Sequence, residues 1–163
     1  MGRRGNDQIL LKSAALGAVA GMRSMAAPAL LSHELAEHGP DRGDGPIERL
    51  LSSEGVSRVL AVFAGGEMLA DKAPFIPDRT SALPLIGRAV MGSLTAATYA
   101  AHRRHPVLMP AAVGAASAIA STFASYHLRR YVSEQLEVPD RLIGLVEDAI
   151  VVGLSRSLGD ELE

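Results

Sequence analysis

PVLMPAAVGAASAIASTFASY, residues 106–126, decides the fold class of this chain, because it contains no charged residue. Apart from the terminal tyrosine, its polar side chains are Ser117, Ser121, Thr122 and Ser125. A membrane-spanning helix needs about 20 predominantly apolar residues. A helix that is apolar all round is either buried in a large protein or inserted in lipid, and a chain of 163 residues is too short to bury several of them. This stretch therefore predicts a helix that spans a membrane.

The composition of the whole chain excludes several classes of function. The residues are 48% hydrophobic, 21% charged and 4% aromatic, and they include no cysteine. Without cysteine the chain has no disulfide, no thiolate metal ligand and no cysteine nucleophile. The formal net charge of −2 provides no positive field to attract nucleic acid. The length fits a single domain that comprises residues 1–163.

Four further segments are poor in charge and rich in Ala, Gly, Leu and Val. Together with the first they predict helices at about 9–31, 56–76, 83–101, 106–130 and 140–158, with a polar loop at 33–55. No segment shows the alternation of Val, Ile and Thr that strands need. The expected fold is all-α, a small polytopic membrane helix bundle with about five spanning or re-entrant helices. A soluble helical bundle that binds an apolar ligand is the less favoured alternative.

Small residues recur at helical spacing in two of these segments. The residues that follow one another at intervals of four are Ser13, Gly17 and Gly21 in the first segment and Ala112, Ala116 and Ala120 in the fourth. Close approach of backbones through such faces is a common way for helices to associate in lipid. We therefore expect both sets to lie at helix–helix contacts.

The first two segments resemble the last two. Residues 16–21, LGAVAG, can be laid over residues 113–118, VGAASA, and Glu67 then falls near Glu147. Because one segment lies between the two pairs, five crossings would invert one pair relative to the other, as in many secondary transporters. Five crossings would also place the two termini on opposite sides. Helices rich in Ala and Gly resemble one another by composition alone, so an inverted repeat and a chance likeness both stay open.

Several charged residues fall within the apolar segments, where a charge at membrane depth is costly. The residues expected at an ion path or substrate site are Arg23, Glu67, Asp71, Lys72, Arg88 and Glu147. Glu67 and Asp71 are four residues apart and share one helix face. The simplest arrangement pairs Arg23 with Glu67 or Glu147, and it leaves at least one further acid that could carry a proton.

Two interpretations of these charges stay open. In the first, they line a polar path in a small transporter or channel-like protein, which is proton-coupled or handles an anion drawn to Arg23. In the second, they form ion pairs that only determine helix packing in a structural or accessory membrane protein. The positions expected near helix ends, where the second interpretation is favoured, are Lys72, Arg88, Asp148 and Arg156.

The sequence offers little other chemistry. The five histidines are expected in loops or at helix ends, and His102 and His105 have no third ligand at a suitable spacing, so we expect no metal site. The sequence contains no Gly-rich phosphate loop, nucleophile elbow or HExxH motif. We expect no enzyme activity, no catalytic residue and no cofactor. The expected partner is the lipid bilayer; nucleic acid is not expected, a homo-oligomer stays open and the substrate is unknown.

Four motifs combine charges with glycines or prolines at places where membrane helices seldom carry charge. They are Gly17-x-x-x-Gly21-Met22-Arg23-Ser24, Gly66-Glu67-x-x-Ala70-Asp71-Lys72, Pro77-x-Arg79-Thr80 and Gly87-Arg88. These motifs resemble a small bacterial membrane-protein family catalogued as domain of unknown function 4126. The resemblance covers nearly the whole chain outside the loop at 33–58. It implies a multi-pass protein of the bacterial inner membrane with no assigned activity. It also favours, as the functional positions, Arg23, Glu67, Asp71, Lys72 and Arg88.

The orientation in the membrane is weakly determined by the sequence. The arginines are divided almost evenly between the two sides that five crossings would create, so the positive-inside bias is close to nil. The loop after the first segment is acidic overall. It therefore favours a cytoplasmic N-terminus, and insertion in both orientations stays open.

Overall fold

The protein is all-α in the part of the chain that its structure, a computed structural model, describes: residues 3–40, 43–70, 81–136 and 140–162. These residues form seven helices and no strand. The helices are α1 (Arg3–Met22), α2 (Ala26–His38), α3 (Pro46–Leu51), α4 (Glu54–Ala70), α5 (Ala82–His102), α6 (Leu108–Leu136) and α7 (Asp140–Leu162). The expected all-α class is confirmed.

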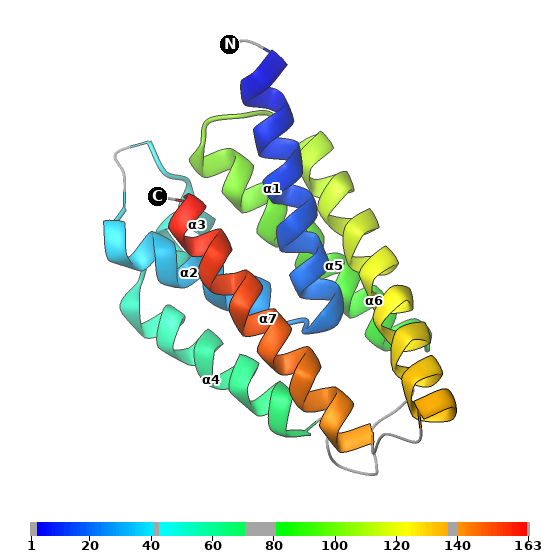
Figure 1. The fold of residues 1–163 in the computed structure, drawn as a ribbon. Coiled ribbons are helices and arrows are strands. Elements are labelled where there is room, and N and C mark those ends of the chain that lie inside the picture. Colours follow the sequence, from blue (N-terminus) through cyan, green and yellow to red (C-terminus); the bar gives the residue numbers. More distant parts are fainter. Residues whose placement is uncertain (1–2, 41–42, 71–80, 137–139, 163) are drawn as a thin grey trace.

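Helices α1, α5 and α6 form the tightly packed centre of the molecule (Figure 1). Their glycines lie where the helices cross. A Cβ added at Gly17 of α1 would overlap the backbone of Gly114 of α6, and one added at Gly92 of α5 would lie 2.7 Å from the Gly114 carbonyl oxygen. A Cβ added at Gly21 would overlap the Ala118 carbonyl. Only hydrogen fits at these positions, so the glycines let the three backbones touch.

The structure corrects the predicted packing face of α6. Ala112, Ala116 and Ala120 are exposed, whereas Gly114 and Ala118 are buried against α1 and α5. The two sets are offset by two residues, which corresponds to about 200° of rotation around a helix. Small residues occur on every side of α6, so their spacing alone does not identify the buried side.

A break at residues 23–25 divides the first predicted helix, 9–31, into two. Helix α1 ends at Met22, and α2 begins at Ala26 and turns the chain back along the bundle (Figure 1). Pro28 lies in the first turn of α2, where a helix tolerates a missing N–H group. The predicted polar loop at 33–55 contains the end of α2 and the short helix α3. The last residues of the predicted helix 56–76 lie outside the described part of the chain.

Helices α1 and α6 run in the same direction, which corrects the inverted relation considered above. Gly17 meets Gly114, and four residues further along both helices Gly21 meets Ala118. Figure 1 shows both helices running down from the same end of the bundle. An inverted repeat would need these two aligned segments to be antiparallel. The extra reversal through α2 removes the inversion, and it also brings the start of α1 and the end of α7 toward one side (Figure 1).

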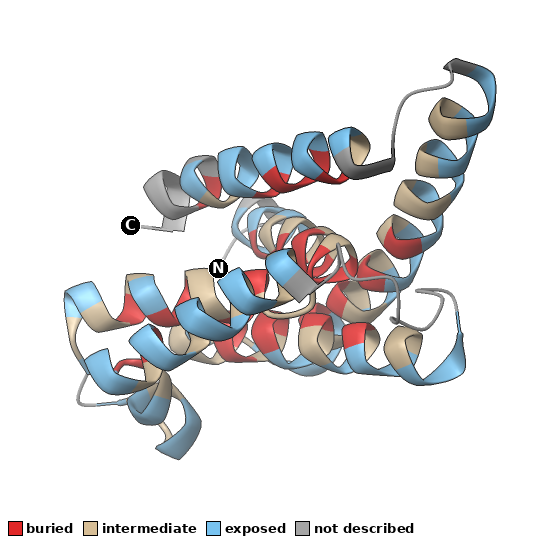
Figure 2. Ribbon diagram, turned by 90° about the horizontal axis from the view of Figure 1, so that it is seen from below, coloured by how far each residue is buried: buried red, intermediate tan, exposed pale blue. Residues whose placement is uncertain are grey.

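The outward sides of the helices are exposed (Figure 2), and they carry many large apolar side chains. The exposed large hydrophobic side chains include Val62 and Phe63 on α4, Ile86 and Leu94 on α5, Met109 and Phe123 on α6, and Leu145 and Ile150 on α7. By contrast, the buried residues include charged ones, Arg23, Arg88, Glu147 and Asp148. Exposed apolar patches and buried charges both depart from the ordinary packing of a soluble protein, and both indicate interaction or functional sites.

One helix among the described residues is long and apolar enough to cross a membrane, Leu108–Gln135 within α6. Its most apolar window is 22% buried, whereas the core helix of a soluble protein would be mostly buried. The expected spanning helix at 106–130 thus has a counterpart in the structure. The other described helices do not meet the same criterion of length and composition.

Candidate functional site

The break between α1 and α2 places a buried arginine in the middle of the bundle. Arg23 follows the last residue of α1, and 1% of its side chain is exposed. Its Nε donates a hydrogen bond to Asp148 Oδ1 over 2.8 Å, and its Nη2 lies 2.6 Å from the same oxygen. Glu147 Oε2 is 3.9 Å from Arg23 Nη2. A charged pair with this little exposure is sensitive to the loss of either partner, because the other charge then stays buried alone.

Two adjacent acids on α7 face the break. Glu147 and Asp148 lie within the helix, remote from its ends at Asp140 and Leu162, and both are buried. Glu147 Oε2 also lies 3.7 Å from Nη1 of Arg129, which comes from the C-terminal half of α6. The two acids of α7 therefore connect the break to α6.

On the other side of the break, Glu67 of α4 binds the start of α2. Its Oε1 accepts hydrogen bonds from the backbone N–H of Ser24 over 2.9 Å and from the Ser24 hydroxyl over 3.0 Å. Its Oε2 accepts one from the Met25 N–H over 2.9 Å. The first N–H groups of a helix have no partner within the helix and carry a partial positive charge. Glu67 thus caps α2 with a carboxylate that comes from a different helix.

The carbonyl groups at the end of α1 are bound by side chains of α5 and α6. Arg88 Nη1 and Thr122 Oγ1 each donate a hydrogen bond to the Gly21 carbonyl over 2.9 Å. Ser121 Oγ donates one to the Ala18 carbonyl over 2.8 Å. The second terminal nitrogen of Arg88 lies 4.0 Å from Glu67 Oε1. These contacts stabilise a helix end that would otherwise leave polar groups unpaired inside the bundle.

Together these residues form a single charge cluster around the break. The charge cluster consists of three cationic and three acidic side chains, Arg23, Arg88, Arg129, Glu67, Glu147 and Asp148. They come from α4, α5, α6, α7 and the break itself, so most of the long helices contribute. The formal charges of these six described side chains balance. Among the described residues, no group of three or more His, Asp or Glu side chains is placed to hold a metal ion. The chemistry that this arrangement offers is exchange of a proton or an ion pair.

Four of the six predicted site residues, Arg23, Glu67, Arg88 and Glu147, meet in this cluster. Asp71 and Lys72 lie outside the described residues. The two expected partners of Arg23 have different roles: Glu147 lies within 4 Å of it, whereas Glu67 caps α2 and approaches Arg88.

One prediction about position was wrong, and two members of the cluster, Asp148 and Arg129, were not among the predicted site residues. Asp148 was expected near a helix end, yet it lies well inside α7 and is buried, whereas Arg88 lies in the second turn of α5 and is also buried. Asp148, not Glu147, is the closest acid to Arg23. Two adjacent acids in one apolar segment are the signal that pointed to Asp148. Arg129 gave no such signal, because it follows the apolar stretch of α6 in the sequence.

Comparison with known proteins provides a family and no characterised relative. No curated protein and no solved structure matches the chain. A family model matches residues 10–157, a range that contains the charge cluster, all of α2 and most of α1. The chain belongs to the family described as Domain of unknown function (DUF4126).

Proposed function

We propose that the protein is a multi-spanning protein of the bacterial inner membrane, and that its charge cluster is the working part of a small proton-coupled transporter or channel-like path. The observation that carries the proposal is the position of the cluster. Six ionic side chains gather at a helix break inside a bundle whose outward faces are apolar. Ionisable groups at membrane depth usually face the bundle interior and mark ion or proton pathways.

The distribution of side chains supports several spans. Helices α1, α5, α6 and α7 contain 20, 21, 29 and 23 residues, which is the length that about 30 Å of hydrocarbon requires. Large apolar side chains point outward on α4, α5, α6 and α7. In water these side chains would be costly to expose, whereas in lipid they meet an apolar solvent. The 13-residue α2 is shorter than a span and fits a re-entrant segment. We place the N-terminus in the cytoplasm.

Glu67 supports a coupled mechanism, because one carboxylate holds three hydrogen bonds at the start of α2 and lies near Arg88. A proton on Glu67 removes the charge that both α2 and Arg88 bind, so it loosens α2 from α4. Discontinuous helices whose ends bind ions are the usual site of binding in secondary transporters.

Proton flux in proteoliposomes tests this proposal. The protein is reconstituted with a pH-sensitive dye inside, and Glu67→Gln is compared with wild type and with the exposed control Glu134→Gln. Glu134 is paired with Arg130 on the surface of α6, so the control removes an acid outside the cluster. We expect Glu67→Gln to abolish the flux and Glu134→Gln to retain it. Unchanged flux in a correctly folded Glu67→Gln protein would contradict the proposal.

The pairing within the cluster favours a second candidate, a structural or accessory membrane protein. Arg23 binds Asp148 at hydrogen-bonding distance, and Glu67 uses both of its oxygens to cap α2. Such bonds also hold helices in register in proteins that transport nothing. Absence of flux from the wild-type protein, combined with a large loss of stability on removal of Arg23, supports this candidate over the first.

A further inference from the structure

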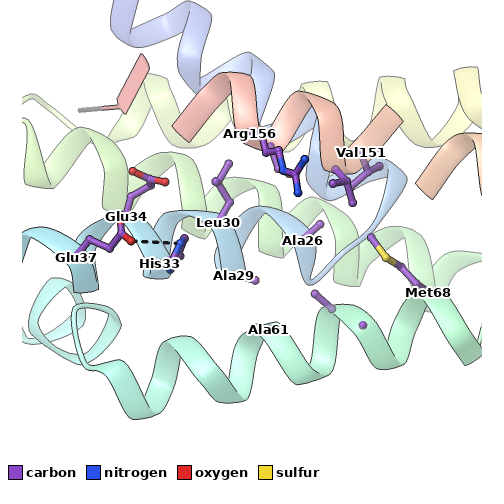
Figure 3. A pocket seen from close by; sticks show the side chains of 14 residues that line it. Ala26, Ala29, Leu30, His33, Glu34, Glu37, Ala61, Met68, Val151 and Arg156 are labelled. Atoms are coloured by element: carbon purple, nitrogen blue, oxygen red, sulfur yellow. Dashed lines mark ion pairs between the residues drawn. The ribbon is translucent and has the colours of Figure 1, made fainter. Parts of the chain in front are cut away.

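A groove of about 760 Å³ lies between α2, α4 and α7, away from the glycine contacts of the centre (Figure 3). This volume falls in the range of small-molecule sites, about 300–1,000 Å³. Small residues line much of the groove, Ala29 on α2 and Ala61, Ala64 and Gly65 on α4. Figure 3 shows Ala29 and Ala61 on the two helices that border it.

The groove changes in chemical character along its length. One end is apolar and is lined by Ala26, Met68 and Val151 (Figure 3). The other end carries Glu37, whose Oε1 lies 3.7 Å from His33 Nε2, and both of these side chains are more than half exposed. This order of an apolar end and an ionic end fits an amphipathic ligand with a long chain and a charged head.

Arg156 determines which head group fits. Its side chain extends from α7 over the groove, between the acidic end and the apolar end (Figure 3). A ligand that lies along the groove therefore meets a carboxylate, then a guanidinium, then apolar side chains. The matching order in a ligand is an ammonium, then a phosphate, then a hydrocarbon chain. Arginine binds phosphate oxygens with paired N–H donors, and a primary ammonium donates hydrogen bonds to a carboxylate.

We propose that this groove binds one phosphatidylethanolamine molecule, with one acyl chain against Ala26 and Met68, its phosphate on Arg156 and its ammonium on Glu37. The inference rests on the proposed membrane location, since the groove would draw its ligand from the bilayer. The anionic lipid phosphatidylglycerol has neutral hydroxyl groups where phosphatidylethanolamine has its ammonium, so no positive charge offsets Glu37. A choline head group has no N–H donor for the carboxylate. The groove therefore selects the primary ammonium lipid.

Native mass spectrometry of the full-length protein in mild detergent tests this selection. The protein is titrated with phosphatidylethanolamine, phosphatidylcholine and phosphatidylglycerol of identical acyl chains. We expect the first lipid to be retained at about tenfold higher occupancy than the other two, because neither of the others offers Glu37 a cationic N–H donor. Glu37→Gln should remove this preference and the surface control Glu134→Gln should keep it. Equal binding of the three lipids by wild type overturns the proposal.

Two leucine substitutions test the place of binding. A Cβ added at Gly65 or at Gly66 meets no atom within 4 Å, so both variants should fold. Gly65 lines the groove, and its neighbour Gly66 does not. We expect Gly65→Leu to lower the retained phosphatidylethanolamine about tenfold, because it displaces at least two methylene groups of the chain, and Gly66→Leu to leave it unchanged.

Equal retention by Gly65→Leu and Gly66→Leu overturns the proposed site, and so does a dimer that Gly65→Leu alone disrupts, since a second copy would then fill the groove. These results do not test the role proposed for the charge cluster. Recovery of the protein in the soluble fraction of lysed cells contradicts the proposed membrane function itself. Loss of proton flux on Glu67→Gln, with no lipid preference, supports the function and overturns only the groove.

Discussion

The two sides of the bundle are held together by different means. In the glycine core, which consists of α1, α5 and α6, backbones touch at Gly17, Gly92 and Gly114 and leave no space. In the outer half, which consists of α2, α4 and α7, ionic and capping bonds join the apolar packing of residues such as Ala27 and Val151, and a groove of about 760 Å³ remains open. Close-packed interiors are rigid, whereas contacts made by a few polar groups can be exchanged. The comparison teaches that the core supplies a rigid frame, and that any moving or binding part belongs to the outer half.

The largest expected effect comes from forcing the glycine core apart. A side chain at Gly114 would overlap the backbone of Gly92 and the side chain of Ala96, and neither helix can move away because each is also packed against α1. We expect Gly114→Leu to exceed the usual overpacking cost of about 1–3 kcal/mol and to yield no folded protein. Size-exclusion chromatography of the detergent-solubilised protein measures this yield. A monodisperse, wild-type-like Gly114→Leu protein would contradict the rigid-core interpretation.

Removal of Arg23 should have the next largest effect. The side chain is 1% exposed, and its loss leaves Asp148 and Glu147 as adjacent buried carboxylates. Breaking a buried pair typically costs about 3–5 kcal/mol. We therefore expect Arg23→Ala to lower the free energy of unfolding in detergent by that amount, measured by denaturant titration. The exposed Arg58, which pairs with Glu54 on α4, is the matched control, and Arg58→Ala should cost less than about 1 kcal/mol.

Both the fold class and the cluster's main residues were accessible from the sequence, but the geometry of the break was not. The apolar stretch of α6 and the cluster charges Arg23, Glu67 and Glu147 follow from composition and from the cost of charge in an apolar segment. The break was missed because residues 9–31 form one long run that is mostly apolar, although Gly21 and Ser24 beside Arg23 are weaker helix formers. Pro28 was the available signal, since proline within an apolar run indicates the first turn of a new helix.

The buried side of α6 was predicted wrongly for a different reason. Ala112 and Ala116 have the spacing of a packing stripe, but so do Gly114 and Ala118 on the opposite side. Spacing identifies which residues share a face and does not identify the face that a neighbouring helix covers. That choice depends on Gly17 and Gly92, which lie far away in the sequence.

A double-mutant cycle between Arg23 and Asp148 sharpens the description of the outer half. Because the two side chains are joined by a 2.8 Å hydrogen bond, the losses of stability caused by the two single substitutions should not add. We expect the double variant Arg23→Ala/Asp148→Ala to be more stable than the sum of the single losses predicts, with a coupling of about 1–3 kcal/mol. The same cycle between Arg23 and Glu67 should give a smaller coupling, because Glu67 binds the backbone before α2 and approaches Arg88 instead of Arg23. A larger coupling of Arg23 to Glu67 than to Asp148 would refute the assignment of the pairs.

Neutralising Glu67 should destabilise the protein less than removing Arg23 does. In Glu67→Gln one oxygen still accepts a hydrogen bond at the start of α2, but the charge that α2 and Arg88 bind is lost. We expect the free energy of unfolding to fall by about 1–2 kcal/mol. Relative to wild type, amide hydrogen exchange should accelerate more in α2 than in α1. Hydrogen exchange followed by mass spectrometry measures both helices in one experiment. Equal acceleration in α1 and α2 would show that the break does not separate a rigid core from a movable half.

The smallest predicted effect is a gain in stability. It comes from replacing a glycine outside the closely packed core. Gly66 of α4 is exposed, and a Cβ there meets no atom within 4 Å, so alanine adds no clash. Alanine also restricts the unfolded chain and favours helix, which stabilises an exposed helical position by about 0.5–1 kcal/mol. We expect Gly66→Ala to raise the thermal midpoint in detergent, whereas Gly92→Ala, with its Cβ 2.7 Å from the Gly114 carbonyl oxygen, should lower it. If both substitutions stabilise the protein, the backbones of α5 and α6 have room to separate, and the contrast between a closed core and an open outer half no longer holds.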